Sequence, residues 1–142
     1  MFDLYKDLII DHGINPRNKY VLSHFTNSST GFNHLCGDKF DIYINLKNDI
    51  LIDLSFTGIG CSVSTASASL LTLLLKNKSL HFSEDLFIYF IKIIKDENSI
   101  CYDEVYCDLN VLANVRKYPS RVKCATLIWH TLAEALKINF KK

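Results

Sequence analysis

Glycine and proline are scarce in this chain, since its 142 residues include five glycines and two prolines. Flexible linkers between domains are usually rich in these residues. No such linker, internal repeat or low-complexity tract interrupts the sequence. The length also suits a domain that buries a sizeable core without help from a structural metal. We therefore predict a single domain over residues 1–142.

Neither sign of charge is in excess, because 16 basic and 15 acidic residues leave a formal net charge of +1. A protein that is drawn to nucleic acid or to an anionic membrane by its overall field carries a clear positive excess. Apolar runs such as residues 70–75 are far shorter than the roughly 20 residues that span a membrane. We therefore expect neither a nucleic-acid partner nor a membrane partner.

The first residues lack the pattern of a secretory signal peptide, although the chain has five cysteines. Disulfide frameworks belong to secreted proteins, whereas thiols stay reduced in the cytoplasm. We expect a cytoplasmic protein with free cysteines that are available for metal binding or catalysis.

Apolar spacing predicts an α+β fold with a small antiparallel sheet covered by helices. Residues 2–11, 64–76, 83–95 and 120–136 have helical spacing, and Ser83 and Ser120 are the expected caps of the last two helices. A polar stretch at residues 27–31 precedes two alternating runs, residues 40–46 and 50–56, which predict one β-hairpin.

Three cysteines and one aspartate form the candidate site: Cys36, Asp38, Cys61 and Cys124. Thiolates with a carboxylate suit zinc or an iron-sulfur cluster. Gly37 lets the loop bend so that its two neighbours can face one ion. Cys124 falls near the start of the last predicted helix, where the helix dipole is expected to lower its pKa. The alternative is that these cysteines are ordinary buried thiols.

Four motifs resemble, in order, those of the IscU/NifU/SufU family of iron-sulfur assembly proteins. They are DHGINPRN at residues 11–18, CGD at 36–38, GCSVSTASAS at 60–69 and RVKCATLIW at 121–129. The resemblance implies the IscU-like fold, also described as the SufE/NifU fold.

Two details resemble the SufU branch of the family. Lys123 precedes Cys124 where scaffold-type members usually have histidine, and an extra segment at about residues 77–99 separates the second and third cysteines. This branch implies zinc held by Cys36, Asp38, Cys61 and Cys124. It also implies a zinc-dependent sulfurtransferase that takes persulfide sulfur from a SufS-type cysteine desulfurase and delivers it to a downstream scaffold or acceptor.

The resemblance assigns two catalytic residues. Cys36 is the expected sulfur acceptor, with Cys124 as its rival, and Arg121 is expected to steady a persulfide or a partner carboxylate. The less favoured alternative is that Arg121 is a solvated arginine at the start of the helix. Two other functions stay open: a scaffold that assembles a [2Fe-2S] cluster on the same ligands, and a binding module whose zinc is structural.

Some candidates fit the pattern less well. His34 stands in a loop from which the family proline is missing, and it could compete for zinc or simply lie at the surface. Cys101 and Cys107 match no common zinc spacing, so we expect free thiols.

Overall fold

The computed structural model describes residues 3–137. Within them lie a three-stranded sheet, five α-helices and three short 3₁₀ helices. The elements are, in order, α1 (Leu4–Ile14), β1 (Asn27–Asn33), β2 (Asp38–Lys47), β3 (Ile50–Ile59), α2 (Ser62–Leu75), α3 (Leu80–Lys95), η1 (Glu97–Ser99), η2 (Glu104–Tyr106), α4 (Cys107–Leu112), η3 (Ala113–Lys117) and α5 (Pro119–Leu136). The α+β expectation is confirmed.

The sheet is antiparallel, in the order β1-β2-β3. The predicted hairpin is β2 and β3, which pair Ile42 with Phe56 and turn through Asn48 and Asp49, both at positive φ. Such φ values suit asparagine and aspartate better than most residues. Both strands run a few residues beyond the predicted limits, and these extensions bring Asp38 into the sheet.

β1 is a strand that the sequence analysis did not predict. Its sequence, NSSTGFN, has almost no apolar alternation, so periodicity gives no signal. The strand is held by its ladder with β2 and by α5, where the side-chain amide of Asn27 donates to the Ala135 carbonyl at 3.0 Å. A side chain at Gly31 would collide with Thr131 of α5. Glycine therefore lets the helix approach the strand closely.

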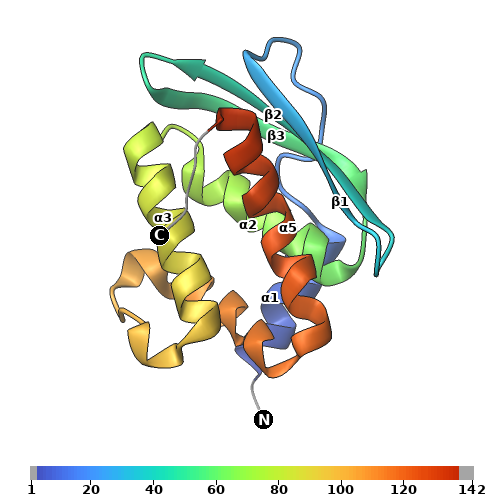
Figure 1. Ribbon diagram of the computed structural model, residues 1–142, viewed down its shortest axis with the longest axis vertical. Coiled ribbons are helices and arrows are strands. Elements are labelled where there is room, and N and C mark those ends of the chain that lie inside the picture. The colour runs from blue at the N-terminus through green and yellow to red at the C-terminus, as the bar shows by residue number, and fades with distance from the viewer. Residues whose placement is uncertain (1–2, 138–142) are drawn as a thin grey trace.

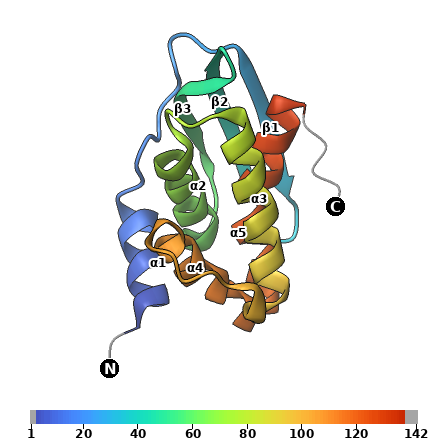
Figure 2. The ribbon, with the colours of Figure 1, turned by 90° about the vertical axis from the view of Figure 1, so that its left-hand side faces the viewer.

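Helices α2, α3 and α5 lie on one face of the sheet, as Figures 1 and 2 show, and the core lies between these layers. The largest buried side chain, Trp129 of α5, donates its indole N–H to the Ser67 hydroxyl of α2 at 3.1 Å. The Ser67 hydroxyl in turn donates to the Ala125 carbonyl at 2.5 Å. Small residues on α2 thus let two helices pack closely while every buried polar atom of this group has a partner.

The predicted caps of α3 and α5 are wrong. α3 begins at Leu80 because the Ser79 side chain accepts the N–H of Phe82, and Ser83 is buried inside the helix. α5 begins at Pro119, whose fixed φ suits a first helical position, so no side-chain cap is needed from Ser120.

The observed limits of α1 and α2 lie closer to the predicted ones. α1 continues to Ile14, past the predicted end at Asp11, and its predicted start at Phe2 lies outside the described residues. α2 begins at Ser62, two residues earlier than predicted. No helix within residues 3–137 combines the length and apolarity that crossing a membrane requires.

The chain between α3 and α5 folds back against α1. Figure 2 shows α4 beside α1 at the end of the molecule away from the hairpin turn. Arg116 of η3 anchors this segment, because its guanidinium donates to the Ile93 carbonyl at the end of α3 at 2.8 and 3.1 Å.

Candidate metal centre

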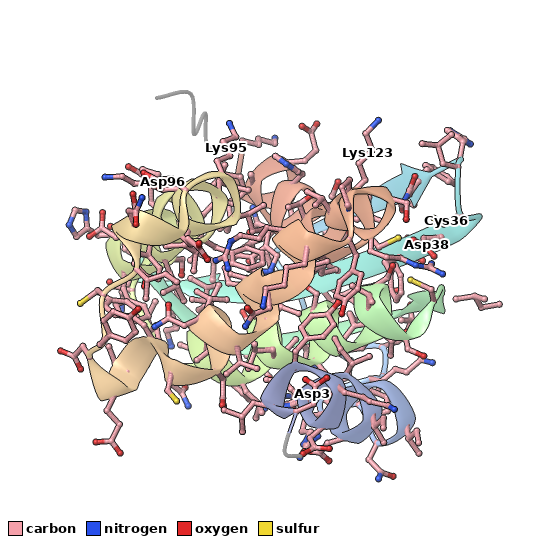
Figure 3. The ribbon with its side chains drawn as sticks, turned by 90° about the horizontal axis from the view of Figure 1, so that it is seen from below. Asp3, Cys36, Asp38, Lys95, Asp96 and Lys123 are labelled. Atoms are coloured by element: carbon pink, nitrogen blue, oxygen red, sulfur yellow. The ribbon has the colours of Figure 1, made fainter. Side chains whose placement is uncertain are left out.

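Four separate elements bring the predicted ligands together at one end of the sheet. Cys36 lies in the turn between β1 and β2, and Asp38 is the first residue of β2. Cys61 is the N-cap of α2, and Cys124 lies in α5. Figure 3 shows Cys36 and Asp38 side by side at this end, with Lys123 of α5 above them.

Three of the four side chains form a tight group. The ligand atoms of Cys36, Asp38 and Cys124 all lie within 4.8 Å of one another, and the Cys36 and Cys124 sulfurs are 3.3 Å apart. Cys36 is exposed, whereas Asp38 and Cys124 are buried. One ion could therefore touch all three donors, with solvent access on the Cys36 side.

Cys61 stands beside this group and not inside it. Its sulfur lies 3.3 Å from the Ser64 hydroxyl and 3.5 Å from the Ser64 N–H, as expected of an N-cap. Its backbone N–H donates to Asp38 at 2.9 Å, and its thiol also shares a hydrogen bond with Cys124. Cys61 is half-buried, and hydrogen bonds connect it to two of the three grouped donors, Asp38 and Cys124.

The Asp38 carboxylate is held by donors on both oxygens. The Cys61 N–H reaches Oδ1, and the Ser64 hydroxyl donates to Oδ2 at 2.7 Å. The Asn33 amide lies 3.5 Å from the same Oδ2 and 3.6 Å from the Cys124 sulfur. Hydrogen-bond donors that surround a metal ligand in this way fix its orientation. Asn33 and Ser64 were not predicted, although Ser64 lies inside the motif at residues 60–69 and Asn33 lies three residues before Cys36.

Two glycines shape the centre. Gly37 has φ +70° in the turn and nothing within 4 Å of the position that a Cβ would occupy. Gly60 is crowded, since a Cβ there would lie 2.6 Å from the Phe40 ring and 2.8 Å from the Asp38 carboxylate. The first glycine permits a backbone conformation, and the second permits close packing.

The pKa of Cys124 contradicts the prediction from the helix dipole. Burial, followed by hydrogen bonds that its thiol gives to Cys36 and Cys61, raises the pKa of Cys124 to about 12. The residue lies five positions after Pro119, beyond the first helical turn, where the dipole is weak. The desolvation of a fully buried thiolate is therefore the larger effect.

Cys61 behaves in the opposite way. Burial raises the pKa of its thiol, but hydrogen bonds from the Ser64 hydroxyl, the Ser64 N–H and Cys124 outweigh burial, so that the net pKa is lowered. The N-cap position therefore favours the thiolate at Cys61, which is the effect that the helix dipole was expected to have on Cys124.

Arg121 is exposed, on the turn of α5 that precedes Cys124. Its pKa is raised, first by a hydrogen bond with the Cys124 side chain and then by electrostatic interactions with Cys61 and Cys124. The guanidinium therefore faces the centre and opposes its negative charge.

Tyr5 is a further neighbour that the sequence analysis missed. Its ring stacks on Tyr118 at 5.6 Å, and its hydroxyl is buried with no partner among the described residues. The pKa of Tyr5 is raised by burial first and next by Tyr118 and Cys61. No motif or spacing pointed to Tyr5, because its position depends on how α1 packs against α2 and on its contact with Tyr118, which precedes α5.

The remaining candidates lie outside the group. His34 is exposed and stacks on Phe32 at 5.6 Å. Cys101 and Cys107 are exposed, free thiols. Large apolar side chains border the thiols instead: Leu35, next to Cys36, and Ile59 are each 81% exposed.

The donor set fits a zinc ion. Zinc accepts both thiolate and carboxylate ligands, usually four in a tetrahedron. Cys36, Cys124 and Asp38 supply two sulfurs and one oxygen within reach of one ion, and Cys61 is the fourth candidate.

Comparison with known proteins identifies the family. The model of the NifU-like N terminal domain matches residues 4–125. The chain belongs to this family, as its motifs predicted.

Individual relatives cover nearly the whole chain. The zinc-dependent sulfurtransferase SufU of Bacillus subtilis is 36% identical over 94% of this chain and 89% of that protein. The iron-sulfur cluster assembly scaffold protein IscU of Streptococcus pyogenes is 31% identical over 94% and 83%.

A solved structure confirms the expected IscU-like fold. It is a putative iron-sulfur cluster assembly scaffold protein for the SUF system from Fervidobacterium islandicum AW-1, with a TM-score of 0.78 and 28% identity. The match covers 94% of this chain and 96% of that one.

Proposed function

We propose that this chain is a zinc-dependent sulfur acceptor that takes persulfide sulfur from a cysteine desulfurase of the SufS type and passes it on for iron-sulfur cluster assembly. The observation that carries the proposal is the group formed by Cys36, Asp38 and Cys124, in which Cys36 is exposed while the other two are buried. The similarity to a named zinc-dependent sulfurtransferase supports it.

Cys36 is the proposed acceptor because it is the exposed thiol of the group and lies in a turn. Its thiolate attacks the outer sulfur of the desulfurase persulfide. A new sulfur–sulfur bond forms on Cys36 as the bond within the desulfurase persulfide breaks, and the desulfurase cysteine leaves as a thiolate. No outside oxidant or reductant is needed, because one persulfide is exchanged for another.

Burial argues against Cys124 as the first acceptor. Its sulfur has no exposed surface and its pKa is raised to about 12, so its thiol is protonated and shielded in the metal-free chain. An attacking sulfur must be both ionised and accessible. Cys36 meets the requirement for access.

Asp38, Cys61 and Cys124 would keep zinc in place while Cys36 is exchanged. When bound, the ion holds coordinated cysteines as thiolates at neutral pH. Arg121 lies close enough to the thiols to balance the negative charge of a persulfide.

The alternative is a scaffold that assembles a [2Fe-2S] cluster on the same side chains. The Streptococcus pyogenes relative is named as a scaffold, and thiolates also bind iron-sulfur clusters. Here the cluster is cargo, and the same three grouped donors would hold it.

Metal analysis of protein purified without oxygen separates these functions. We expect about one zinc per chain from the tetrahedral donor set. Iron and sulfide in equal amounts, with negligible zinc, would instead establish the scaffold.

Mass spectrometry after incubation with a desulfurase and cysteine tests the acceptor. We expect the mass of one sulfur atom to be added to the peptide that contains Cys36, and to be lost in Cys36→Ser. The controls are Cys101→Ser and Cys107→Ser, which change exposed thiols outside the group. Sulfur on the Cys124 peptide that persists in Cys36→Ser protein would contradict the assignment.

A further inference from the structure

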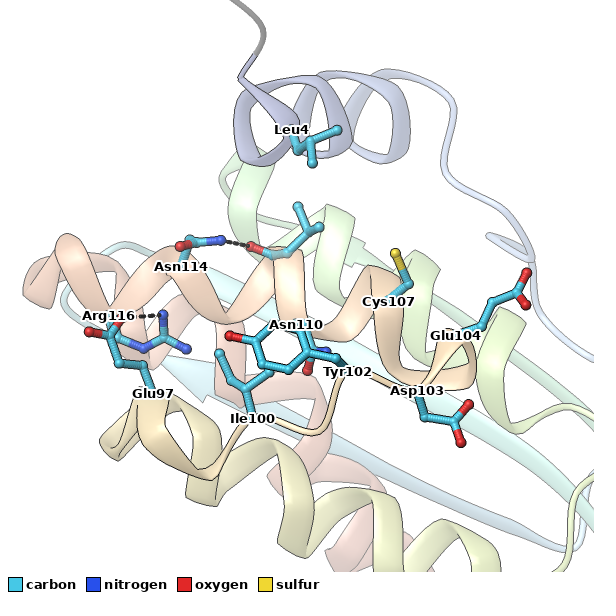
Figure 4. Close-up of a pocket in the computed structure, with 11 residues that line it drawn as sticks. Leu4, Glu97, Ile100, Tyr102, Asp103, Glu104, Cys107, Asn110, Asn114 and Arg116 are labelled. Atoms are coloured by element: carbon cyan, nitrogen blue, oxygen red, sulfur yellow. Dashed lines mark hydrogen bonds and ion pairs between the residues drawn. The ribbon is translucent and has the colours of Figure 1, made fainter.

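A second hollowed surface lies between α1 and the segment from Glu97 to Arg116. Two hollows of about 480 and 360 Å³ adjoin there and share Leu4, Cys107 and Val111. Figure 4 shows the larger hollow, with Leu4 of α1 on one side and Glu97, Tyr102 and Asp103 on the other. We call the pair the α1–α4 furrow. No member of the metal centre lines either hollow.

The floor of the furrow is apolar and accessible. Leu4 is 54% exposed at the junction of the two hollows, and Leu8, Ile100 and Val111 are partly buried around it. Tyr102, 89% exposed, stands in the lining of the larger hollow. An exposed leucine and tyrosine beside a concave surface are suitable contacts for an apolar side chain from another molecule.

Carboxylates surround this apolar floor. Six of them line the hollows: Asp7, Asp11, Glu97, Asp103, Glu104 and Asp108. Asp11 pairs with Arg17 at 2.9 Å, and Glu97 lies 3.7 Å from Arg116. The other four have no ion-pair partner among residues 3–137.

Within the described part of the chain, positive charge does not fill the furrow. No lysine among residues 3–137 lines either hollow, and the guanidinium of Arg116 is occupied by the Ile93 carbonyl and Glu97. His12 hydrogen-bonds to Ser69, and burial, followed by the charge of Arg17, lowers the pKa of its imidazole. The lining is therefore strongly negative in a chain whose formal net charge is +1.

We propose that the α1–α4 furrow is a docking site for a lysine- and arginine-rich segment of a partner protein that carries one apolar anchor side chain. The unpaired carboxylates attract the basic side chains and fix the register of the segment, while the anchor contacts Leu4 and Val111. Tyr102 offers a ring face to an arginine. Nucleic acid is repelled by the same charges.

Fluorescence anisotropy with a labelled synthetic peptide tests the site. The probe is a short peptide of lysine and arginine with one central leucine, used at low salt with the full chain. The variant Glu104→Gln/Asp108→Asn removes two unpaired charges. The control, Asp85→Asn/Glu134→Gln, removes two exposed charges that line neither hollow. We expect the furrow variant to weaken binding about tenfold and the control less than about twofold.

A second peptide, with serine in place of leucine, tests the apolar floor. It should bind the unchanged chain several-fold more weakly, and amide chemical shifts on binding the leucine peptide should map to residues 4–12 and 97–116.

Three results would overturn the proposal. They are an equal loss of affinity in the furrow and control variants, chemical shifts centred outside the furrow, and full competition by spermidine at equal charge concentration, which would indicate a site for small cations. Because zinc content and sulfur transfer to Cys36 are measured separately, this proposal can fail while the proposed function stands.

Discussion

The candidate metal centre has a turn side and a helix side that differ in burial and in packing. Cys36 lies in an exposed turn beside Gly37, whose Cβ position is open. Cys61 and Cys124 belong to α2 and α5, and a side chain at Gly60 would strike Asp38 and Phe40. The difference teaches that packing constrains the candidate ligand Cys36 less than it constrains the candidates on the helix side. Asp38, buried between the two sides, connects them.

The largest effect is expected from removing this connection. Asp38→Ala takes away one proposed ligand and leaves the Ser64 hydroxyl and the Cys61 N–H without their acceptor. We expect zinc affinity to fall by more than the roughly 10–100-fold that loss of an outer partner causes. We also expect the metal-free chain to lose about 1–3 kcal/mol of stability.

Competitive zinc titration and thermal unfolding measure these two losses. Asp41→Ala is the matched control, because Asp41 is also on β2 but outside the group of donors. Equal losses in both variants would show that Asp38 does not connect the two sides.

Alkylation of the metal-free chain compares the two sides directly. Cys36 is exposed, whereas Cys124 is buried and its pKa is raised to about 12. At pH 8 we expect iodoacetamide to modify Cys36 at least about tenfold faster than Cys124, because only an accessible thiolate reacts. Peptide mass spectrometry over time gives the two rates. Similar rates would mean that the helix side opens as readily as the turn.

Alanine at the two glycines sharpens the same comparison. Gly60→Ala places a methyl group 2.6 Å from the Phe40 ring, and we expect a loss of about 1–3 kcal/mol from overpacking. Gly37→Ala meets no atom within 4 Å, so only its φ of +70° opposes the change, with a loss of about 1–2 kcal/mol. Zinc affinity should fall more in Gly60→Ala. Denaturant unfolding and zinc titration of both variants provide the values.

The last comparison concerns alkaline pH. The folded pKa of Cys124 is raised to about 12, above its ordinary value, so the neutral thiol is the form that the fold favours. The folding stability that comes from this raised pKa is fully present below the pKa of Cys124 in the unfolded chain, near 9, and is lost as the pH rises toward 12. We expect the metal-free chain to lose stability over this range and Cys124→Ala to show a shallower loss. An unchanged slope would show that Cys124 is not the group responsible.

Sequence patterns predicted the hairpin and most of the helices because alternation and helical spacing are local properties. They do not reveal β1, because that strand depends on β2 and α5. They also misplace two helix starts, since Ser79 and not Ser83 caps α3, and Pro119 begins α5 without a cap from Ser120. The motifs also named four ligand candidates, of which three meet within 4.8 Å.

The sequence by itself named the candidate ligands, through the motifs around Cys36, Cys61 and Cys124, and it indicated the family that the NifU-like match confirms. Only the tertiary structure decided how each thiol behaves. Burial against the core raises the pKa of Cys124, while the hydrogen bonds of an N-cap lower that of Cys61. The structure also brought Asn33, Ser64 and Tyr5 to the centre. Burial and hydrogen-bond partners come from segments far apart in the chain, so no local pattern could reveal them.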